Sequence, residues 1–302
     1  MKIIFMGTPE YAARILEKII TTKDMEVVAV YTQPDKPVGR KKVLTPSIVK
    51  TVALQNNIKV YQPNRLREAD VIEELKKIEC DYIVVAAYGQ ILPREILEHA
   101  PCINLHASIL PQYRGASPIQ QALLKGESKT GVTAMLMNEG LDTGDIIKIK
   151  EIDIDKNEMA ESLFNKLADV ASELTVDVLE NFNKYTPVKQ DNSKSSHCTK
   201  ITKQDGEVTF EEAKTLFNKY RAFTPWPGVY LSSKLKLKRI EFLENETQNE
   251  SGKILKIEKD SIIVGCKKGS IRVYNVQPES KKEMDILSYI NGKRIGVADT
   301  LS

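Results

Sequence analysis

The spacing of apolar positions predicts an alternation of strands and helices over the first 188 residues. Short apolar runs predict strands at residues 2–6, 26–31, 81–86, 102–106, 131–137 and 146–150, and amphipathic stretches predict helices at 9–20, 47–55, 68–79, 119–125 and 158–184. Thr8 is expected as the N-cap of the first helix, with Pro9 at its first position. A β-α-β opening favours parallel strands joined by right-handed crossovers. We therefore expect an α/β fold over residues 1–188: a Rossmann-like open, mostly parallel sheet with helices on both faces.

The pattern changes after residue 188. Residues 189–206 are polar, which is typical of a linker between domains. Residues 207–302 combine a helix at 210–220, short strands at 235–243, 252–257, 262–266 and 270–276, and a last helix at 284–292. Strands of this length and spacing predict a small, OB-like C-terminal β-barrel. Lys234, Lys236 and Lys238 alternate with leucines, which predicts three ammonium groups on one strand face.

Composition excludes several classes of protein. The net charge is +3, and residues 206–302 hold 17 Lys and Arg against 13 Asp and Glu, an excess compatible with nucleic-acid binding but too small to prove it. Three histidines and four scattered cysteines argue against a zinc site and a disulfide framework. Gly7 stands alone, so the dinucleotide fingerprint is absent and a nicotinamide-dependent enzyme is rejected. No membrane-spanning run or signal peptide is evident, and we expect a cytoplasmic location.

The strand at 102–106 carries the strongest candidate chemistry. Asn104 and His106 are two residues apart, so they share one face, and the following Pro111 and Gly115 place a loop at the strand's end. Ligands bind at this end of the strands in open α/β sheets. From the pair alone, a structural asparagine beside a surface histidine explains the pattern as well as a catalytic site does.

Three further segments are open to two interpretations each. The loop at 33–46 holds three prolines and four basic residues, and its charge suits a phosphate backbone or simply solvent. The loop at 87–93 could bind a flat heteroaromatic ring, or it could simply connect a strand to a helix. The turn at 138–145 contains Asp142 and Asp145, either of which could only stabilise the turn.

Together these segments resemble the methionyl-tRNA formyltransferase family over nearly the whole chain. The resemblance rests on motifs in sequence order: Phe5-Met6-Gly7-Thr8-Pro9, Gln33-Pro34-Asp35-Lys36-Pro37-x-Gly39-Arg40, Ala87-Tyr88-Gly89-Gln90-Ile91-Leu92-Pro93, Asn104-Leu105-His106-Ala107-Ser108-x-Leu110-Pro111, Tyr113-Arg114-Gly115-Ala116-x-Pro118-Ile119-Gln120, Gly131-Val132-Thr133, Leu141-Asp142-Thr143-Gly144-Asp145 and Thr224-Pro225-Trp226-Pro227-Gly228.

The resemblance implies transfer of a formyl group from 10-formyltetrahydrofolate to the α-amino group of methionine on initiator tRNA, in translation initiation. It implies that Asn104, His106 and Asp142 are catalytic. It assigns two segments to the folate donor: Ala87, Tyr88, Gly89, Gln90, Ile91 and Leu92, and Ser108, Ile109, Leu110 and Pro111. We also expect six basic residues to bind tRNA: Arg40, Lys41, Lys42, Lys234, Lys236 and Lys238. No metal is expected, and we expect a monomer without a membrane partner.

One departure concerns the basic loop. The family commonly has Gly-Arg-Gly-Lys-Lys-Leu where this chain has Gly39-Arg40-Lys41-Lys42-Val43, so the second glycine is missing and the roles of Lys41 and Lys42 are open.

The chemistry and the alternatives can be stated from the residues. A carboxamide N–H and a protonated imidazole can donate to the oxyanion that forms when an amine attacks a formyl carbon, and a carboxylate can take the amine proton. The alternatives are a formyltransferase for a small amine, a formyltetrahydrofolate hydrolase or dehydrogenase module, and a non-catalytic RNA- or folate-binding protein.

Overall fold

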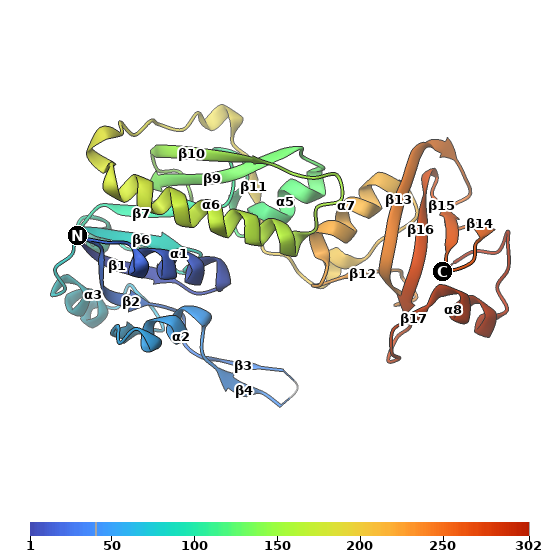
Figure 1. The fold of residues 1–302 in the computed structure, drawn as a ribbon, viewed down its shortest axis with the longest axis horizontal. Coiled ribbons are helices and arrows are strands. Elements are labelled where there is room, and N and C mark those ends of the chain that lie inside the picture. Colours follow the sequence, from blue (N-terminus) through green and yellow to red (C-terminus); the bar gives the residue numbers. More distant parts are fainter. Residues whose placement is uncertain (40, 302) are drawn as a thin grey trace. The chain divides into compact units, whose positions relative to one another are not determined.

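A computed structural model describes residues 1–39 and 41–301 of the chain (Figure 1). Its contacts separate two compact units. The first comprises Met1–Pro118, Lys129–Ile154 and Leu163–Thr199; the second comprises Ile119–Ser128, Asp155–Ser162 and the chain from Lys200 onward.

The first unit is built on a seven-stranded sheet in the order β10-β9-β7-β6-β1-β2-β5. Its strands are β1 (Lys2–Gly7), β2 (Glu26–Tyr31), β5 (Val60–Tyr61), β6 (Tyr82–Ala86), β7 (Cys102–His106), β9 (Lys129–Leu136) and β10 (Ile146–Asp153). The five strands from β7 to β5 are parallel, whereas β9 is antiparallel to β7 and β10 is antiparallel to β9. The expected open, mostly parallel sheet is confirmed.

Helices cover the sheet because its strands are apolar on both faces. Ile4 and Met6 of β1 pack with α3 (Ala69–Lys76) and α4 (Arg94–Leu97) in one core cluster. The alternate residues Ile3 and Phe5 are fully buried on the other face. There α1 (Glu10–Thr21) contacts β1, β2 and β6, and it also contacts α2 (Ile48–Gln55). Arg14 of α1 binds Asp169 of α6 (Ala160–Glu180) at 2.9 Å.

Local boundaries differ from the expectations in two places. Pro9, not Thr8, is the N-cap of α1, because the Thr8 hydroxyl donates to the carbonyl of Tyr88 instead of capping the helix. The long helix expected at 158–184 ends at Glu180 and is followed by a 3₁₀ turn, Phe182–Lys184. Both differences come from tertiary contacts or end geometry that apolar spacing does not encode.

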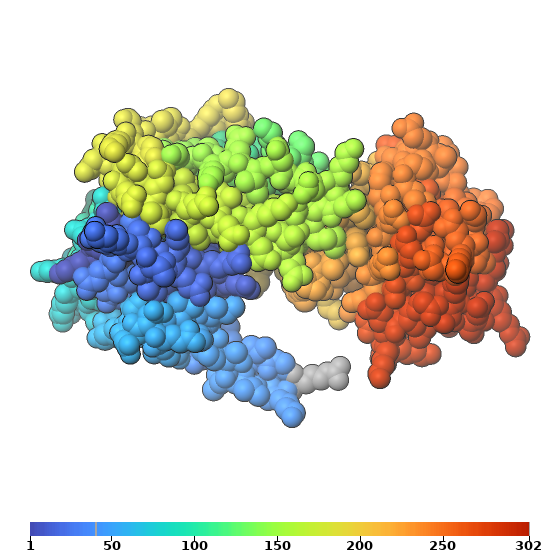
Figure 2. All heavy atoms as spheres, in the orientation of Figure 1, coloured from blue at the N-terminus to red at the C-terminus, as the bar shows by residue number. Residues whose placement is uncertain are grey.

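The segment expected as an unstructured loop at 33–46 contains a β-hairpin. Strands β3 (Lys36–Val38) and β4 (Val43–Thr45) pair antiparallel, and they extend away from the body of the first unit (Figures 1 and 2). Val38, Val43 and Leu44 are exposed on it. Apolar spacing did not predict these strands, because this two-stranded ribbon has no buried face that would give it a hydrophobic period.

The second unit is mainly an antiparallel sheet in the order β12-β13-β16-β15-β14, with β17 paired to β16. Its elements are α5 (Pro118–Lys125, whose first residue belongs to the first unit), α7 (Ala213–Phe223), β12 (Val229–Tyr230), β13 (Lys236–Gln248), β14 (Ile254–Ile257), β15 (Ile262–Gly265), β16 (Lys268–Gln277), β17 (Met284–Asp285) and α8 (Ile286–Lys293). Repeated register shifts between β13 and β16 let these long strands bend. The curved antiparallel sheet is consistent with the small C-terminal barrel that was expected.

Residues 189–206, expected as a linker, are ordered. They contain the 3₁₀ turns Asn192–Lys194 and Gln204–Gly206, and strand β11 (His197–Cys198), which pairs in parallel with β8 (Arg114–Gly115). Residues up to Thr199 belong to the first unit. The domain boundaries at 188 and 207 stay a prediction.

Candidate active site

The carboxyl ends of three parallel strands meet at one point of the sheet edge. Thr8 follows β1, Gln33 follows β2 and Tyr88 follows β6. The Thr8 hydroxyl and the Gln33 side-chain amide both donate to the Tyr88 carbonyl, at 3.2 Å and 3.1 Å. Because β1 is flanked by β2 on one side and β6 on the other, this is the topological switch point, where open α/β sheets bind ligands.

Asn104, His106 and Asp142 lie together beside this edge. The Asn104 Nδ2 donates to Asp142 Oδ1 at 3.3 Å, and the His106 Nδ1 lies 3.6 Å from Asp142 Oδ2. The His106 and Asp142 side chains are 7% and 10% exposed, so the pair is largely shielded from water. The structure thus brings the three residues together, with Asn104 and His106 both turned toward the carboxylate.

The second ring nitrogen of His106 fixes its tautomer. Nε2 lies 2.9 Å from the carbonyl oxygen of Tyr113. A carbonyl can only accept a hydrogen bond, so Nε2 carries a proton and donates it. Nδ1 is the nitrogen that faces Asp142. A second proton, on Nδ1, would make the imidazole ring a cation next to the Asp142 carboxylate.

The backbone around Asp142 is held in an uncommon conformation. Asp142 has a φ of 52°, in the left-handed region that non-glycine residues rarely adopt. Its Oδ2 accepts the backbone N–H of Gly115 at 2.8 Å, and Gln190 Nε2 donates to its carbonyl at 2.9 Å. Gly144 lies so close to the Leu136 carbonyl that a Cβ there would clash. The turn is therefore tied to residues far away in sequence and does more than end a strand.

The segment at 87–92 is a tight, mostly backbone-lined turn. Ala87 and Gly89 both have positive φ, 45° and 82°, while Tyr88 and Leu92 are buried beneath them. Gln90 accepts the Leu66 N–H and donates to the Pro63 carbonyl, which fixes the turn to the preceding loop. Ile91 is 80% exposed, so one apolar side chain of the segment faces solvent.

The segment at 108–111 is half-buried, and its backbone is held by Thr133 of β9. The Thr133 hydroxyl donates to the Ser108 carbonyl at 2.7 Å and accepts the Leu110 N–H at 3.1 Å. The Ser108 hydroxyl donates to the Gln112 carbonyl. Ser108 and Leu110 are buried, whereas Ile109 and Pro111 are partly exposed and available to a ligand.

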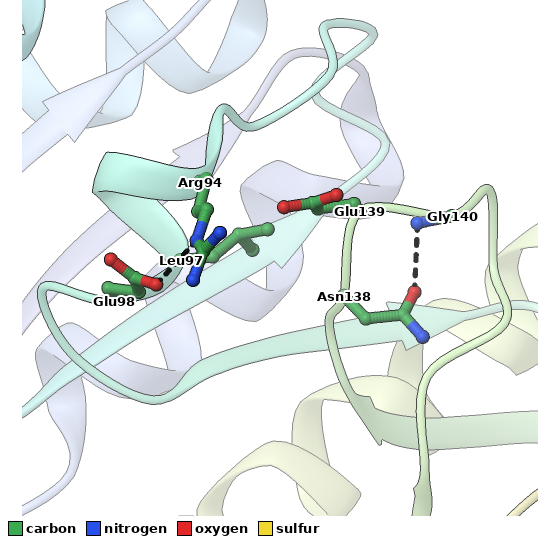
Figure 3. A pocket seen from close by; sticks show the side chains of 6 residues that line it. All are labelled: Arg94, Leu97, Glu98, Asn138, Glu139 and Gly140. Atoms are coloured by element: carbon green, nitrogen blue, oxygen red, sulfur yellow. Dashed lines mark hydrogen bonds and ion pairs between the residues drawn. The ribbon is translucent and has the colours of Figure 1, made fainter.

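A pocket that sequence reasoning missed opens next to these segments. Arg94 and Leu97 of α4 and the next residue, Glu98, line one side, and Asn138, Glu139 and Gly140 line the other (Figure 3). Arg94 binds Glu98 at 2.7 Å, and Asn138 accepts the Gly140 N–H at 3.0 Å. Along the chain, a single residue separates Arg94 of this lining from Leu92, and a single residue separates Gly140 from Asp142. Neither lining segment carries a sequence signal, because the pocket exists only where α4 faces the loop.

Arg114 and Gln190 are also polar residues at the site that were not predicted as functional. Arg114 is 4% exposed, although arginine is rarely buried. Gln190 stands in a polar run that resembles a linker. Only the structure shows that this arginine is buried, so no sequence pattern identified it as part of the site.

The thiols do not offer a nucleophile. Burial raises the pKa of the cysteine side chains, to about 11 for Cys80 and about 12 for Cys102 and Cys266, and it also raises the pKa of Cys198, the one next to the site. A thiol with a raised pKa stays protonated at neutral pH and is a poor nucleophile.

Among the described residues, no group of three or more His, Cys, Asp or Glu could hold a metal ion. In the described part of the chain, no helix has the length and apolar character needed to cross a membrane.

The basic residues expected to bind tRNA are distributed over both units. Arg40 lies outside the described residues, while Lys41 and Lys42 are exposed between β3 and β4. In the second unit, Lys236 and Lys238 lie on β13 and alternate with the buried Leu237. Lys234 precedes that strand and has a φ of 67°, so it is not part of the strand face that was expected. The Lys234 Nζ lies 4.0 Å from Glu207 Oε2, and the Lys238 Nζ lies 3.9 Å from Glu283 Oε2.

Comparison with known proteins agrees with this geometry. A family model described as "Formyl transferase" matches residues 1–179, and one described as "Formyl transferase, C-terminal domain" matches residues 200–294. The chain is 72% identical over its full length to a curated methionyl-tRNA formyltransferase of Sulfurimonas denitrificans, which it covers completely. It is 54% identical to one of Nitratiruptor sp. over 99% of both chains.

Solved structures give the same fold. A crystal structure of an N-formyltransferase from Helicobacter canadensis, in complex with folinic acid and dTDP-3-aminofucose, superposes with a TM-score of 0.69 at 21% identity, over 91% of this chain and 99% of that one. At that identity the likeness concerns the fold alone. The matching family models and the full-length identity are decisive: the chain belongs to the formyl transferases, in the methionyl-tRNA formyltransferase family.

Proposed function

We propose that the protein transfers the formyl group of 10-formyltetrahydrofolate to the α-amino group of methionine esterified to initiator tRNA. The observation that carries the proposal is the shielded cluster of Asn104, His106 and Asp142 at the carboxyl edge of the sheet. Full-length identity of 72% to a protein named methionyl-tRNA formyltransferase supports the choice of acceptor.

The cluster can perform each proton and charge step of this transfer. The neutral methionyl amine attacks the formyl carbon, and the former carbonyl oxygen becomes an oxyanion. Asn104 has two N–H donors, of which one binds Asp142, so the second is available to that oxygen. His106 Nδ1, once protonated, can donate to the same oxygen or to Asp142.

The remaining proton moves through the carboxylate. Asp142 accepts the proton that the attacking amine loses, directly or through a water molecule. The bond between the formyl carbon and N10 of the folate then breaks, and N10 takes up a proton. The products are formylmethionyl-tRNA and tetrahydrofolate, and neither an oxidant nor an enzyme nucleophile is required.

We assign the folate donor to the two segments beside the cluster. Ala87 to Leu92 offers backbone groups and an apolar floor of Tyr88 and Leu92, which suits a flat pterin ring. Ile109 and Pro111 lie partly exposed at the other segment, 108–111. The pocket between α4 and Asn138–Gly140 extends this region (Figure 3). A fold neighbour that was crystallised with folinic acid supports a folate-type donor.

We assign the tRNA acceptor to the exposed hairpin and to basic residues of the second unit. The hairpin presents Lys41 and Lys42 at its tip, and exposed single-stranded ends are the parts of an RNA that proteins read most readily. We propose that the protein acts in the cytoplasm, as a monomer, with no membrane partner.

One assay separates this proposal from its alternatives. Formyl transfer is measured with charged initiator tRNA, with a nucleotide-linked amino sugar and with water as the acceptor, each at the same donor concentration. We expect turnover only with the charged tRNA. Equal or faster transfer to the amino sugar would establish a small-amine formyltransferase, net hydrolysis would establish a hydrolase, and folate or RNA binding without turnover would establish a binding protein.

Binding of the tRNA should depend on salt through the hairpin lysines. Replacing Lys41 and Lys42 together by alanine should weaken binding and reduce the slope of log affinity against log salt by about 2, one for each lost phosphate contact. The measurement is Kd for initiator tRNA between about 50 and about 200 mM salt. Alanine at the exposed consecutive residues Lys76 and Lys77, at the end of α3, makes the same charge change and serves as the control. An unchanged slope in the hairpin variant would remove these lysines from the tRNA interface.

A further inference from the structure

The segment at 188–198, which we call the brace, contacts two loops that carry the candidate catalytic groups. At its start, Val188 and Ile146 exchange backbone hydrogen bonds of 2.8 Å, next to the turn that holds Asp142. At its end, β11 pairs with β8, and the Ser196 hydroxyl accepts the Tyr113 N–H at 2.9 Å. The Tyr113 carbonyl in turn accepts the proton of His106 Nε2.

Gln190 lies in the middle of the brace and binds both loops through one carboxamide. Its Nε2 donates to the carbonyls of Asp142 and Gly144, at 2.9 Å and 2.8 Å. Its Oε1 accepts from Nε and Nη2 of Arg114, at 3.1 Å and 2.7 Å. Both donors and both acceptor positions of the side chain are therefore used, and they fix its orientation.

Arg114 sets the direction of that carboxamide. Its guanidinium is buried and donates to two neutral oxygens, Gln190 Oε1 and, at 2.8 Å, Asn192 Oδ1. A buried guanidinium cannot act as an acceptor, so Gln190 must present oxygen to Arg114 and nitrogen to Asp142. Arg114, on the neighbouring strand β8, thus makes Gln190 present its N–H groups to the left-handed backbone of Asp142.

We propose that Gln190 is a positioning residue that holds Asp142 against His106, with Arg114 orienting it. The proposal rests on the proposed function, because it assigns a purpose to the Asp142 carboxylate in formyl transfer. Gly115, the residue after Arg114, donates to Asp142 Oδ2, so the same strand supports the backbone and the side chain of Asp142. Small displacements of a catalytic group are costly, because transfer requires reacting atoms at near-contact distance.

The substitution Gln190→Glu isolates the contact to Asp142. A carboxylate still accepts from Arg114, so the brace stays attached to β8, but it cannot donate to the carbonyls of Asp142 and Gly144. We expect kcat to fall by about 10- to 100-fold, with KM for donor and tRNA within about threefold of the original values. Gln190→Met, which keeps the volume and removes the donors, should give a similar loss of kcat. Gln55→Glu makes the same change at an exposed position of α2 and is the control.

A second measurement reports on position without turnover. The chain has only three histidines, so the ring nitrogen NMR signals of His106 can be assigned with a His106→Asn variant. We expect these signals to move in both Gln190 variants, while those of His99, whose Nε2 bonds to the Ile78 carbonyl, stay in place.

The outcomes separate the two proposals. If the unaltered protein transfers no formyl group to charged tRNA, the proposed function fails, and the His106 signals alone decide the positioning role. If both Gln190 variants leave kcat and the His106 signals unchanged, or if they change KM alone, the positioning role is wrong. Should Gln190→Glu not fold, Gln190→Met still removes both donors to the loop at Asp142, although it also removes the oxygen that accepts from Arg114.

Discussion

Replacing Asp142 by asparagine should lower kcat by about 1,000-fold, the middle of the range for losing a positioned proton acceptor. The carboxylate accepts two hydrogen bonds, from Asn104 Nδ2 and from the Gly115 N–H, and it faces His106 Nδ1. An asparagine side chain has one oxygen, so one of these groups would meet an N–H₂ donor instead. The amine proton would also lose its acceptor. The measurement is single-turnover formylation of charged initiator tRNA.

This variant should still bind both substrates, because the residues assigned to donor and acceptor lie elsewhere. KM should therefore change by no more than about threefold, which marks a loss confined to the transition state. Asp169→Asn removes an exposed carboxylate from α6 and should leave kcat unchanged. A kcat for Asp142→Asn equal to that of the control would show that the aspartate only stabilises its turn.

Replacing Asn104 by alanine should lower kcat by roughly 100- to 1,000-fold, the usual effect of removing one donor to an oxyanion. Asn104 lies on β7 between Val85 of β6 and Met135 of β9, so its side chain is held by a rigid sheet. The alanine variant loses the donor to the formyl oxygen and also the bond that orients Asp142. The loss should be of the same order as that for Asp142→Asn.

The double variant Asn104→Ala with Asp142→Asn tests whether the two residues act as a unit. If they do, the combined loss should be much smaller than the product of the two single losses, as for other catalytic groups that depend on each other. Asn165→Ala on the exposed surface of α6 controls for the amide deletion. Independent, multiplying losses would contradict the shared role that their 3.3 Å contact suggests.

Some of the fold could be predicted from local pattern because burial imposes it. The runs that became β1 and β6 are apolar on both faces, as strands covered by helices must be. The strands β1, β6 and β7 were found with boundaries correct to about one residue. The hairpin at 36–45 could not be found in this way, because its exposed strands have no buried face and their pairing depends on backbone bonds alone.

The candidate site divides in the same manner. Asn104 and His106 share a strand face, so period-2 alternation already placed them on one side of the sheet. That Asp142 would join them was a hypothesis from family resemblance, and its position depends on the antiparallel pairing of β9 with β7. The pocket beside α4 and the contact of Gln190 with Asp142 had no local signal.

The sequence by itself determined the alternation of strands and helices, the family and the residue types at the sheet edge, since these follow from hydrophobic period and from long ordered motifs. The tertiary structure alone decided that residues 188–198, most of which belong to the expected linker at 189–206, contact the loops of the candidate site. The physical reason is that buried backbone carbonyls and a buried guanidinium require hydrogen-bond partners. A polar residue in the sequence can supply such a partner or can face solvent, and the sequence pattern does not distinguish the two.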